Sequence, residues 1–421
     1  SRRTGGSMSN RIMSPAVALA VTVLAACAGD QPAEPGTVEL ARGGNAAPLT
    51  ATPTSLPLVL PSAATGTVTA RVQFVGVISA ASSDAACATV SPLDLPATKP
   101  AGSSVYVASF TVTAEGAGSC TITLTDKRGG TATVQVVVRE APPVDGTRLV
   151  FTSNREGNNE LYTSNGDGSD LVRLTETAAN EKDPAFFPDR SKIVYASDET
   201  GTWNLFMANA DGTGRVQLTF YDLGEGFGAV SPAVSPDGGQ IAFMLFPGFG
   251  GGNQLHIHVM DAVAGATPVA ITAGNTQNGD PAWTLDGRIV FSSLEFDPGP
   301  PVTSGFPSIW IMFANGASPT RLTNASGTGD GNPAVSPDGT TIAFVRGGGI
   351  ALMDIDGGNV RFVVAGSSSG SPVFSPDGSW LAFLRFQLTD SEIMVLKFGE
   401  PESSALNVTG NTAGDGSPDW K

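Results

Sequence analysis

The chain has 421 residues, including 52 glycines and 30 prolines, and 41% of its residues are hydrophobic. It has 39 acidic and 23 basic residues, and the formal net charge of −16 repels phosphate backbones, which argues against a nucleic-acid partner. With only two histidines and three cysteines, we expect no metal and no cofactor. This length and turn-rich composition favour an all-β fold in two or three domains.

Residues 1–26 have the pattern of a secretory signal peptide, because basic residues precede an apolar stretch that begins at Ile12. The stretch is about 15 residues long, which is short for a membrane span of roughly 20 residues. Its last residues, Leu24 to Ala26 followed by Cys27, resemble the bacterial lipobox. This resemblance implies that Cys27 is lipidated; an ordinary signal peptide with a chance cysteine is the alternative.

A lipid anchor would place the protein in the bacterial cell envelope. Ala28 follows the cysteine where an aspartate commonly retains lipoproteins at the inner membrane, so we expect the outer membrane, with the protein facing the periplasm or the exterior. Residues 27–48 are rich in Ala, Gly, Pro and Glu without hydrophobic periodicity, and we expect a flexible tether.

Residues 49–140 are expected to form a small all-β module. Strand-like segments cover 67–74, 105–112, 120–124 and 131–138, and a hairpin turn is predicted at 126–129. Short strands over about 90 residues are typical of a β-sandwich. The pattern from Gly118 to Val136 resembles bacterial immunoglobulin-like domains, and this implies a small immunoglobulin-like sandwich.

Cys87 and Cys120 both belong to this module, and export would place them in an oxidising compartment. We therefore favour a disulfide between them. A metal site is the alternative, but two cysteines with no histidine nearby cannot fill four ligand positions.

Residues 148–421 contain a repeat in which proline is followed by a variable residue and then often an aromatic one. The six prolines stand 39 to 52 residues apart: Pro184, Pro232, Pro281, Pro333, Pro372 and Pro418. A turn of the Ser-Pro-Asp-Gly kind follows five of them, with its aspartate at Asp189, Asp237, Asp286, Asp338 and Asp377.

Each unit continues with an apolar segment that we expect to be an inner strand, such as Ile241-Ala-Phe, and with a third strand and a fourth. The third strands are predicted at Leu161-Tyr, Leu205-Phe, Leu255-His, Ile309-Trp, Ile350-Ala and Ile393-Met. Four strands in about 47 residues, repeated, are typical of propeller blades. The first apolar strand, at Leu149, has no proline strand before it, and Ser417–Lys421 supplies one, so we expect a closed ring of six blades.

The recurring Pro-x-Phe-Ser-Pro-Asp-Gly pattern, then Ile-Ala-Phe and Arg-Leu-Thr, resembles the TolB-type propeller repeat, a relative of the WD repeat. The resemblance covers 148–421 and implies a six-bladed β-propeller. It also implies periplasmic or outer-membrane protein partners. The immunoglobulin-like module differs from the α/β domain of TolB, so the Tol partnership does not transfer directly.

Three groups of residues could carry chemistry, and for each the structural reading is favoured. Ser368 sits in a Gly-x-Ser-x-Gly motif, but no histidine follows it and no strand-to-helix turn surrounds it. His256 and His258 share one side of a strand, and His256 is assigned to a repeated packing position. Asp354 and Asp356 with Asn359 fit a turn better than a calcium site.

Two insertions, around 248–253 and 295–306, are candidate recognition loops, with Phe246, Phe249 and Phe296 as candidate contacts; a merely solvated excursion is the alternative. The predicted function is therefore non-catalytic binding of an envelope protein or peptide. One alternative is glycan binding, which would need an exposed tryptophan such as Trp203 or Trp310. The other is a polysaccharide- or peptide-cleaving enzyme, which would need clustered acids or histidines.

Overall fold

The computed structural model describes residues 49–421 except 61–64, 74–75, 145, 225, 248–253, 275–276, 295–305, 325–326 and 367. The predicted signal peptide, Cys27 and the tether lie outside these residues. The described part of the chain divides into two compact units, with the boundary between Glu140 and Ala141. It contains no helix with the length and apolar character that crossing a membrane requires.

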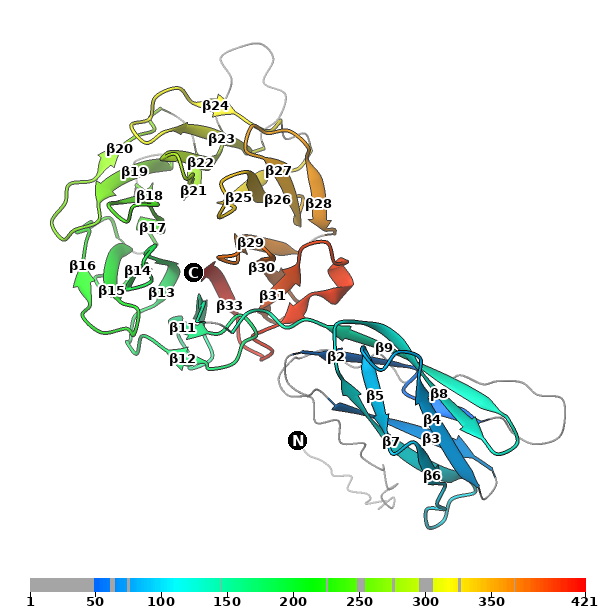
Figure 1. Cartoon of the computed structure of the whole chain (residues 1–421). Helices are drawn as coiled ribbons and strands as arrows, with labels where there is room; N and C mark the ends of the chain where they lie inside the picture. The colour runs from blue at the N-terminus through cyan, green and yellow to red at the C-terminus, as the bar shows by residue number, and fades with distance from the viewer. Residues whose placement is uncertain are drawn as a thin grey trace, which may run out of the picture. The chain divides into compact units, whose positions relative to one another are not determined.

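The first unit contains a four-stranded and a five-stranded sheet (Figure 1). The four-stranded sheet has the order β1 (Thr50–Thr52), β3 (Thr65–Val72), β7 (Tyr106–Ala114) and β5 (Ala88–Ser91). The five-stranded sheet has the order β2 (Ser55–Val59), β9 (Thr131–Arg139), β8 (Gly118–Asp126), β4 (Val77–Ser82) and β6 (Asp94–Pro96). Buried and exposed side chains alternate along β3, β8 and β9, as expected when one face of a sheet is buried.

Both sheets contribute to one hydrophobic core, in which Val68 and Phe110 from one sheet and Ile122 and Val134 from the other are fully buried. The predicted disulfide between Cys87 and Cys120 is present, with a Cα–Cα distance of 6.2 Å. It joins β8 to the segment just before β5, and therefore links the two sheets.

Within the described part of 141–421, the chain forms six four-stranded antiparallel sheets arranged in a ring (Figure 1). The first to sixth sheets are numbered here by their innermost strands: β33 (Asp415–Trp420), β13 (Glu181–Phe186), β17 (Gly228–Val234), β21 (Asn278–Trp283), β25 (Asp330–Val335) and β29 (Ser369–Phe374). The second strands are β10 (Leu149–Ser153), β14 (Lys192–Ser197), β18 (Gln240–Phe246), β22 (Arg288–Ser293), β26 (Thr341–Arg346) and β30 (Trp380–Phe386).

The third strands are β11 (Glu160–Ser164), β15 (Asn204–Asn209), β19 (His256–Asp261), β23 (Ser308–Phe313), β27 (Gly349–Asp354) and β31 (Ser391–Lys397). The outer strands are β12 (Val172–Arg173), β16 (Val216–Gln217), β20 (Val269–Ala270), β24 (Thr320–Arg321), β28 (Arg361–Val364) and β32 (Leu406–Asn407). A short 3-10 helix, η1 (Glu402–Ser404), precedes β32.

The ring is closed by strands from opposite ends of the repeat region. Consecutive innermost strands contact one another, and β29 contacts β33, which in turn contacts β13. As the repeat pattern predicted, β33 pairs with β10, so that Leu149 lies opposite Trp420. Arg148 and Lys421 exchange two backbone hydrogen bonds of 2.7 and 3.0 Å.

The packing between sheets explains the repeated apolar segment. Its third residue is an aromatic side chain that is almost completely buried in every sheet: Phe151, Tyr195, Phe243, Phe291, Phe344 and Phe383. We predicted this segment as the inner strand, but this was wrong, because the proline strand lies inside it. The segment is second from the axis, where neighbouring sheets cover both its faces, so it is apolar without alternation.

The third-strand assignment was wrong in the third sheet. We assigned Leu255 and His256 to the repeated positions, but the register places His258 opposite Phe243, just as Tyr162 lies opposite Phe151. The hairpin between β18 and β19 contains extra residues, so the predicted third-strand positions were two residues too early.

Candidate functional site

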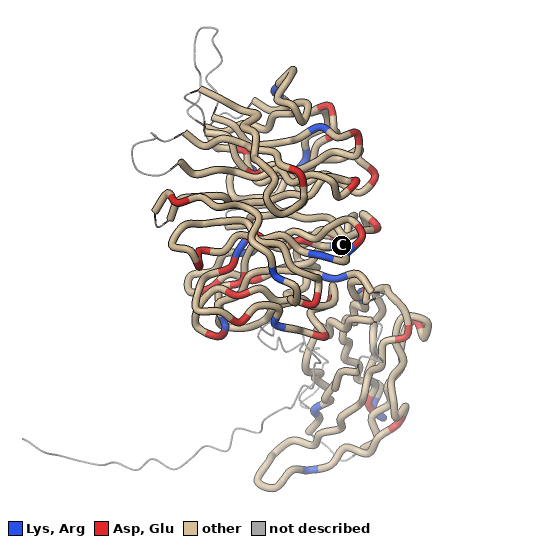
Figure 2. Tube along the Cα trace, turned by 90° about the vertical axis from the view of Figure 1, so that its left-hand side faces the viewer, with Lys and Arg blue, Asp and Glu red and all other residues tan. Residues whose placement is uncertain are grey.

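The antiparallel order of the strands gives the ring two different faces. Turns between innermost and second strands, and between third and outer strands, emerge on one face, which we call the turn face. Loops between second and third strands, and connections from outer strands to the next innermost strand, emerge on the other, the loop face. Acidic residues are spread over both faces rather than gathered in one patch (Figure 2).

The innermost strands carry a conformational feature that recurs once in every sheet. The residue before each repeat proline has a positive φ between 44° and 52°: Asp183, Ser231, Asp280, Asn332, Ser371 and Ser417. The pairing register shifts at each of these bulges. Residues before proline favour extended backbone, so six left-handed ones must be held by their surroundings.

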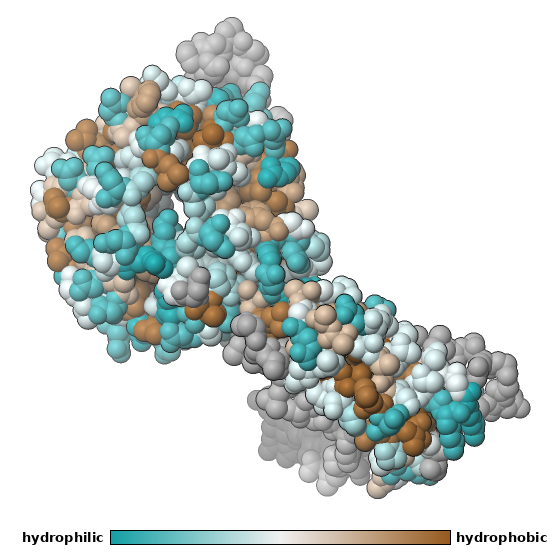
Figure 3. Space-filling model, viewed as in Figure 1, coloured by the Kyte–Doolittle hydropathy of each residue, from teal (hydrophilic) through white to brown (hydrophobic). Residues whose placement is uncertain are grey.

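These six residues, which we call the pre-proline ring, are all half-buried and lie on the innermost strands, which surround the ring axis (Figure 1). The space-filling view shows a hollow at this axis (Figure 3). All six side chains are short and polar, which suits the left-handed conformation. The axial opening is therefore bordered by groups that can accept or donate hydrogen bonds.

Two carboxylates connect the pre-proline ring. Asp183 accepts hydrogen bonds from the Ser417 hydroxyl at 2.7 Å and from the backbone N–H of Ser231 at 3.2 Å. Asp280 accepts from the Ser292 hydroxyl at 3.0 Å and from the Asn332 N–H at 3.3 Å. Burial, and then the negative charge of Asp183, raises the pKa of Asp280. The opening thus combines polar groups with a rigid backbone.

The pre-proline ring was not predicted, because each repeat unit was taken to begin at proline. The signal was nevertheless present, since the preceding residue is Asp, Asn or Ser in all six units. Asp and Asn are among the residue types that tolerate positive φ most easily after glycine.

A pair of buried glutamates lies between the first and second sheets. Glu160 and Glu181 are both fully buried. Glu160 accepts from the Arg173 guanidinium at 3.0 Å and the Thr177 N–H at 2.8 Å, whereas Glu181 accepts from the hydroxyls of Thr177 at 2.9 Å and Ser197 at 3.0 Å. The Oε2 atom of each glutamate is buried without a partner.

Burial and the adjacent Glu160 raise the pKa of Glu181 to about 8. Burial also opposes ionisation of Glu160, but hydrogen bonds from Thr175 and Thr177 lower its pKa overall. Glu181 therefore holds a proton next to an ionised Glu160 near neutral pH.

The predicted turn aspartates organise the hairpins of the turn face. Asp237 shows the arrangement, since its carboxylate accepts from the Ser235 hydroxyl at 2.6 Å and from the Gly239 N–H at 2.9 Å. These hydrogen bonds lower the pKa of Asp237. The contacts are internal to the turn.

Of the three candidate recognition residues, Phe249 and Phe296 lie outside the described residues. Phe246, at the end of β18, is 38% exposed, and its ring centroid lies 6.1 Å from that of Phe227. Two further aromatic side chains of the loop face, Phe220 and Phe386, are 71% and 50% exposed. No periodic pattern predicted these two, because each stands just outside the repeat motif.

Of the two histidines, His258 occupies the repeated packing position, and the Nδ1 of His256 lies 3.5 Å from the Thr272 hydroxyl. His258 stacks on Phe243 with ring centroids 5.5 Å apart, and burial lowers the pKa of both His256 and His258. Ser368 is exposed in the connection between β28 and β29, and its carbonyl accepts from the Phe386 N–H. Both groups therefore have structural explanations.

Trp203 and Trp310 were the candidates for glycan binding, and the turn at Asp354 was the candidate for calcium binding. Trp203 is half-buried with the Lys182 ammonium 4.2 Å from its ring, and the buried indole nitrogen of Trp310 has no partner. The Asn359 amide donates to Asp354, as in an ordinary turn. In the part of the chain that the structure describes, no group of three or more His, Cys, Asp or Glu residues could hold a metal ion.

A closed ring of four-stranded antiparallel sheets around an axial opening defines the second unit as a β-propeller. A family model described as "TolB beta propeller domain" matches residues 132–245. The "Protein TolB homolog" of Chlorobium chlorochromatii (strain CaD3) is 29% identical over 202 residues, which are 48% of this chain and 32% of the relative. The match thus spans about a third of that relative's length.

Solved structures give the same fold. TolB from Acinetobacter baumannii superposes with a TM-score of 0.53 at 20% identity, covering 72% of this chain and 79% of that one. A chain of a nidogen/laminin complex superposes with a TM-score of 0.50 at 10% identity, covering 65% and 98%. The second unit is a TolB-like β-propeller.

Proposed function

We propose that this chain is a non-catalytic protein- or peptide-binding component of the bacterial cell envelope. In this proposal the six sheets are the blades of a six-bladed propeller spanning 148–421. Residues 49–140 form a bacterial immunoglobulin-like sandwich, residues 27–48 a tether and residues 1–26 a lipoprotein signal peptide. The TolB-named relatives support the envelope assignment.

The observation that carries the binding role is the axial opening of the ring (Figure 3). The pre-proline ring borders it with hydrogen-bonding groups on a backbone fixed by Asp183 and Asp280. Peptide backbone needs donors and acceptors from its partner, and rigid donors cost little entropy on binding. Exposed Phe220 and Phe386 add apolar area on the loop face.

Anchoring through Cys27 completes the proposal. The lipobox-like segment supports it, and two or three acyl chains would give stable attachment. We expect radiolabelled palmitate to be incorporated into the wild-type chain and not into Cys27→Ser. Labelling of both proteins, or of neither, would contradict this part.

Photocrosslinking from native envelopes tests the binding face. Phe220 and Phe386 of the loop face are each replaced by p-benzoylphenylalanine in the full chain. Phe313 and Leu285, which are 52% and 58% exposed on the turn face, give the controls. The proposal expects one reproducible protein adduct from the loop-face positions that is absent from the controls.

Equal adducts from all four positions, or adducts from the controls alone, would overturn the assignment of the loop face. Adducts to polysaccharide, or to no envelope component at all, would overturn protein binding itself. Glycan arrays and hydrolase screens would then test the two alternative functions.

A further inference from the structure

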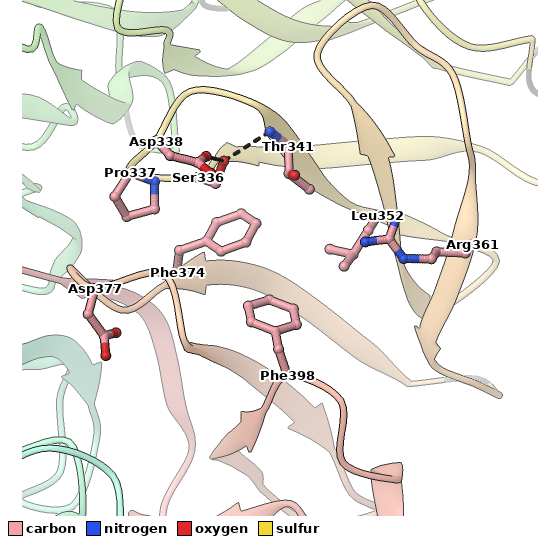
Figure 4. A pocket seen from close by; sticks show the side chains of 10 residues that line it. Ser336, Pro337, Asp338, Thr341, Leu352, Arg361, Phe374, Asp377 and Phe398 are labelled. Atoms are coloured by element: carbon pink, nitrogen blue, oxygen red, sulfur yellow. Dashed lines mark hydrogen bonds between the residues drawn. The ribbon is translucent and has the colours of Figure 1, made fainter.

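The seam between the fifth and sixth sheets contains a pocket of about 190 Å³ that opens on the turn face (Figure 4). The turns at Asp338 and Asp377 form one side of it, and Phe374, Phe398 and Leu352 supply apolar surface. An engineered cavity of about 150 Å³ can hold benzene, so this volume has room for one large apolar side chain.

The pocket exists because the turn of the sixth sheet does not pack against the preceding sheet as closely as most of the corresponding turns do. In four of the sheets, the glycine of the third-to-outer turn lies against a backbone carbonyl of the preceding sheet. In the sixth sheet the corresponding Gly399 has no atom within 4 Å of its virtual Cβ. Gly265 of the third sheet is also open, but there Ala262 and Ala266 pack on the core.

Two side chains at this seam depart from the repeat. Phe398 follows β31 at the position that the strand register gives to Gly166, Ala210, Ala262, Ala314 and Ile355 in the other sheets. Its ring lies 5.6 Å from that of Phe374, and both rings face the pocket (Figure 4). The bulk of Phe398 adds an aromatic wall where the other blades carry smaller side chains.

The second departure is Arg361, which pairs across the strands with Leu352. The corresponding outer-strand positions hold Val172, Val216, Val269, Thr320 and Leu406. Among the ten described arginines of 141–421, the other nine have a hydrogen bond or ion pair, and exposed Arg361 has neither. An unpartnered guanidinium at a pocket mouth is suited to a carboxylate.

The opposite side of the pocket carries negative charge. A hydrogen bond from Ser336 lowers the pKa of Asp338. Burial opposes the ionisation of Asp377, but hydrogen bonds from Ser375 and Ser379 keep its pKa low. Figure 4 shows these carboxylates and Arg361 on opposite sides of the two phenylalanine rings.

We propose that this seam pocket binds the C-terminus of a peptide that ends in a large apolar residue preceded by basic residues. The terminal carboxylate pairs with Arg361, the apolar side chain packs on Phe374 and Phe398, and the basic residues face Asp338 and Asp377. This site is separate from the axial opening and does not depend on the function proposed above.

The test is fluorescence anisotropy of a labelled Gly-Lys-Lys-Phe peptide titrated with the full chain. We expect saturable binding with a free C-terminus, and binding weakened about tenfold or more when the peptide is amidated. Arg361→Gln should weaken the free peptide as much as amidation does, without weakening the amidated peptide further. Phe398→Ala should weaken both peptides.

Arg288→Gln is the matched control, since Arg288 is a partly exposed arginine that forms its ion pair with Asp286. It should bind the free peptide like wild type, and unchanged melting temperatures should show that all variants fold. Absence of saturable binding below about 1 mM, the weak end of specific affinities, would overturn the proposal. Equal binding of both peptides by wild type, or unchanged binding by Arg361→Gln, would also overturn it.

Discussion

The buried pair between the first and second sheets makes the stability of the propeller depend on pH. The pKa of Glu181 is about 8 in the folded state against an ordinary 4.5, so the folded protein retains a proton that the unfolded chain releases. The associated stability is fully present below pH 4.5 and is lost as pH rises towards 8. Between pH 5 and pH 8 the loss is at most about 3.5 kcal/mol.

The informative change is Glu181→Gln, which keeps the shape and removes the ionisation. Its free energy of unfolding should exceed that of wild type increasingly as pH rises, because the neutral amide needs no proton. Partial rehydration of the site would reduce the gain, so we expect about 2 kcal/mol at pH 8. The neighbouring Glu160 stays ionised across this range, since its pKa is lowered.

Urea unfolding followed by tryptophan fluorescence measures this directly. All five tryptophans lie in the second unit, so the signal reports on the propeller alone. His256 and His258 titrate with opposite sign, since burial lowers their pKa, but they cancel in the comparison with wild type. Glu176→Gln is the control, because Glu176 lies in the connection just before Glu181 and its side chain is 86% exposed.

A difference between wild type and Glu181→Gln that stays constant from pH 5 to pH 8 would refute the explanation that Glu181 retains a proton in the folded state. So would a pH-dependent gain of the same size in Glu176→Gln, because the effect would then come from general charge repulsion.

Three further changes test the packing. Trp420→Ala removes a buried side chain from the closing strand and should cost about 3–5 kcal/mol in urea unfolding, whereas the half-buried Trp203→Ala should cost less. Asp330→Asn breaks a two-point ion pair with Arg346 (2.7 Å each) and should lower the melting temperature, whereas an unchanged value would show that the pair contributes little. Reduction of Cys87–Cys120 should destabilise the first unit by roughly 3–4 kcal/mol and leave the tryptophan-detected transition unchanged.

The repeat made most of the propeller predictable. Turn aspartates and buried aromatic residues recur because each sheet packs against its neighbours in the same way. The pairing of β33 with β10 followed from counting strands. The strands β3, β7, β8 and β9 of the first unit were also predicted, because alternation marks a half-buried sheet. The short Ala- and Ser-rich strands β4 and β5 lack that signal and were missed.

The candidate sites were less predictable, since they depend on which side chains meet across two sheets. Arg361 lies outside the recurring sequence pattern, and only the structure shows that it lines a pocket beside the sixth sheet. Glu160 and Glu181 stand 21 residues apart and become one buried pair through the geometry of the connection between sheets. Spacing within one repeat cannot reveal such contacts.

The pairing of β10 with β33 also determines the order in which the ring can be completed. The partner strand of Leu149 lies about 270 residues later in the chain, so this pairing can form only after the last strand has been made. Until that strand arrives, β10 presents an unpaired edge, and the sixth sheet has no neighbour beyond it. The equivalent strand of a second molecule would fit that edge equally well, so crowded, half-folded chains would exchange their last strands. A cell that makes this protein therefore benefits from keeping nascent copies apart until each ring has closed on itself.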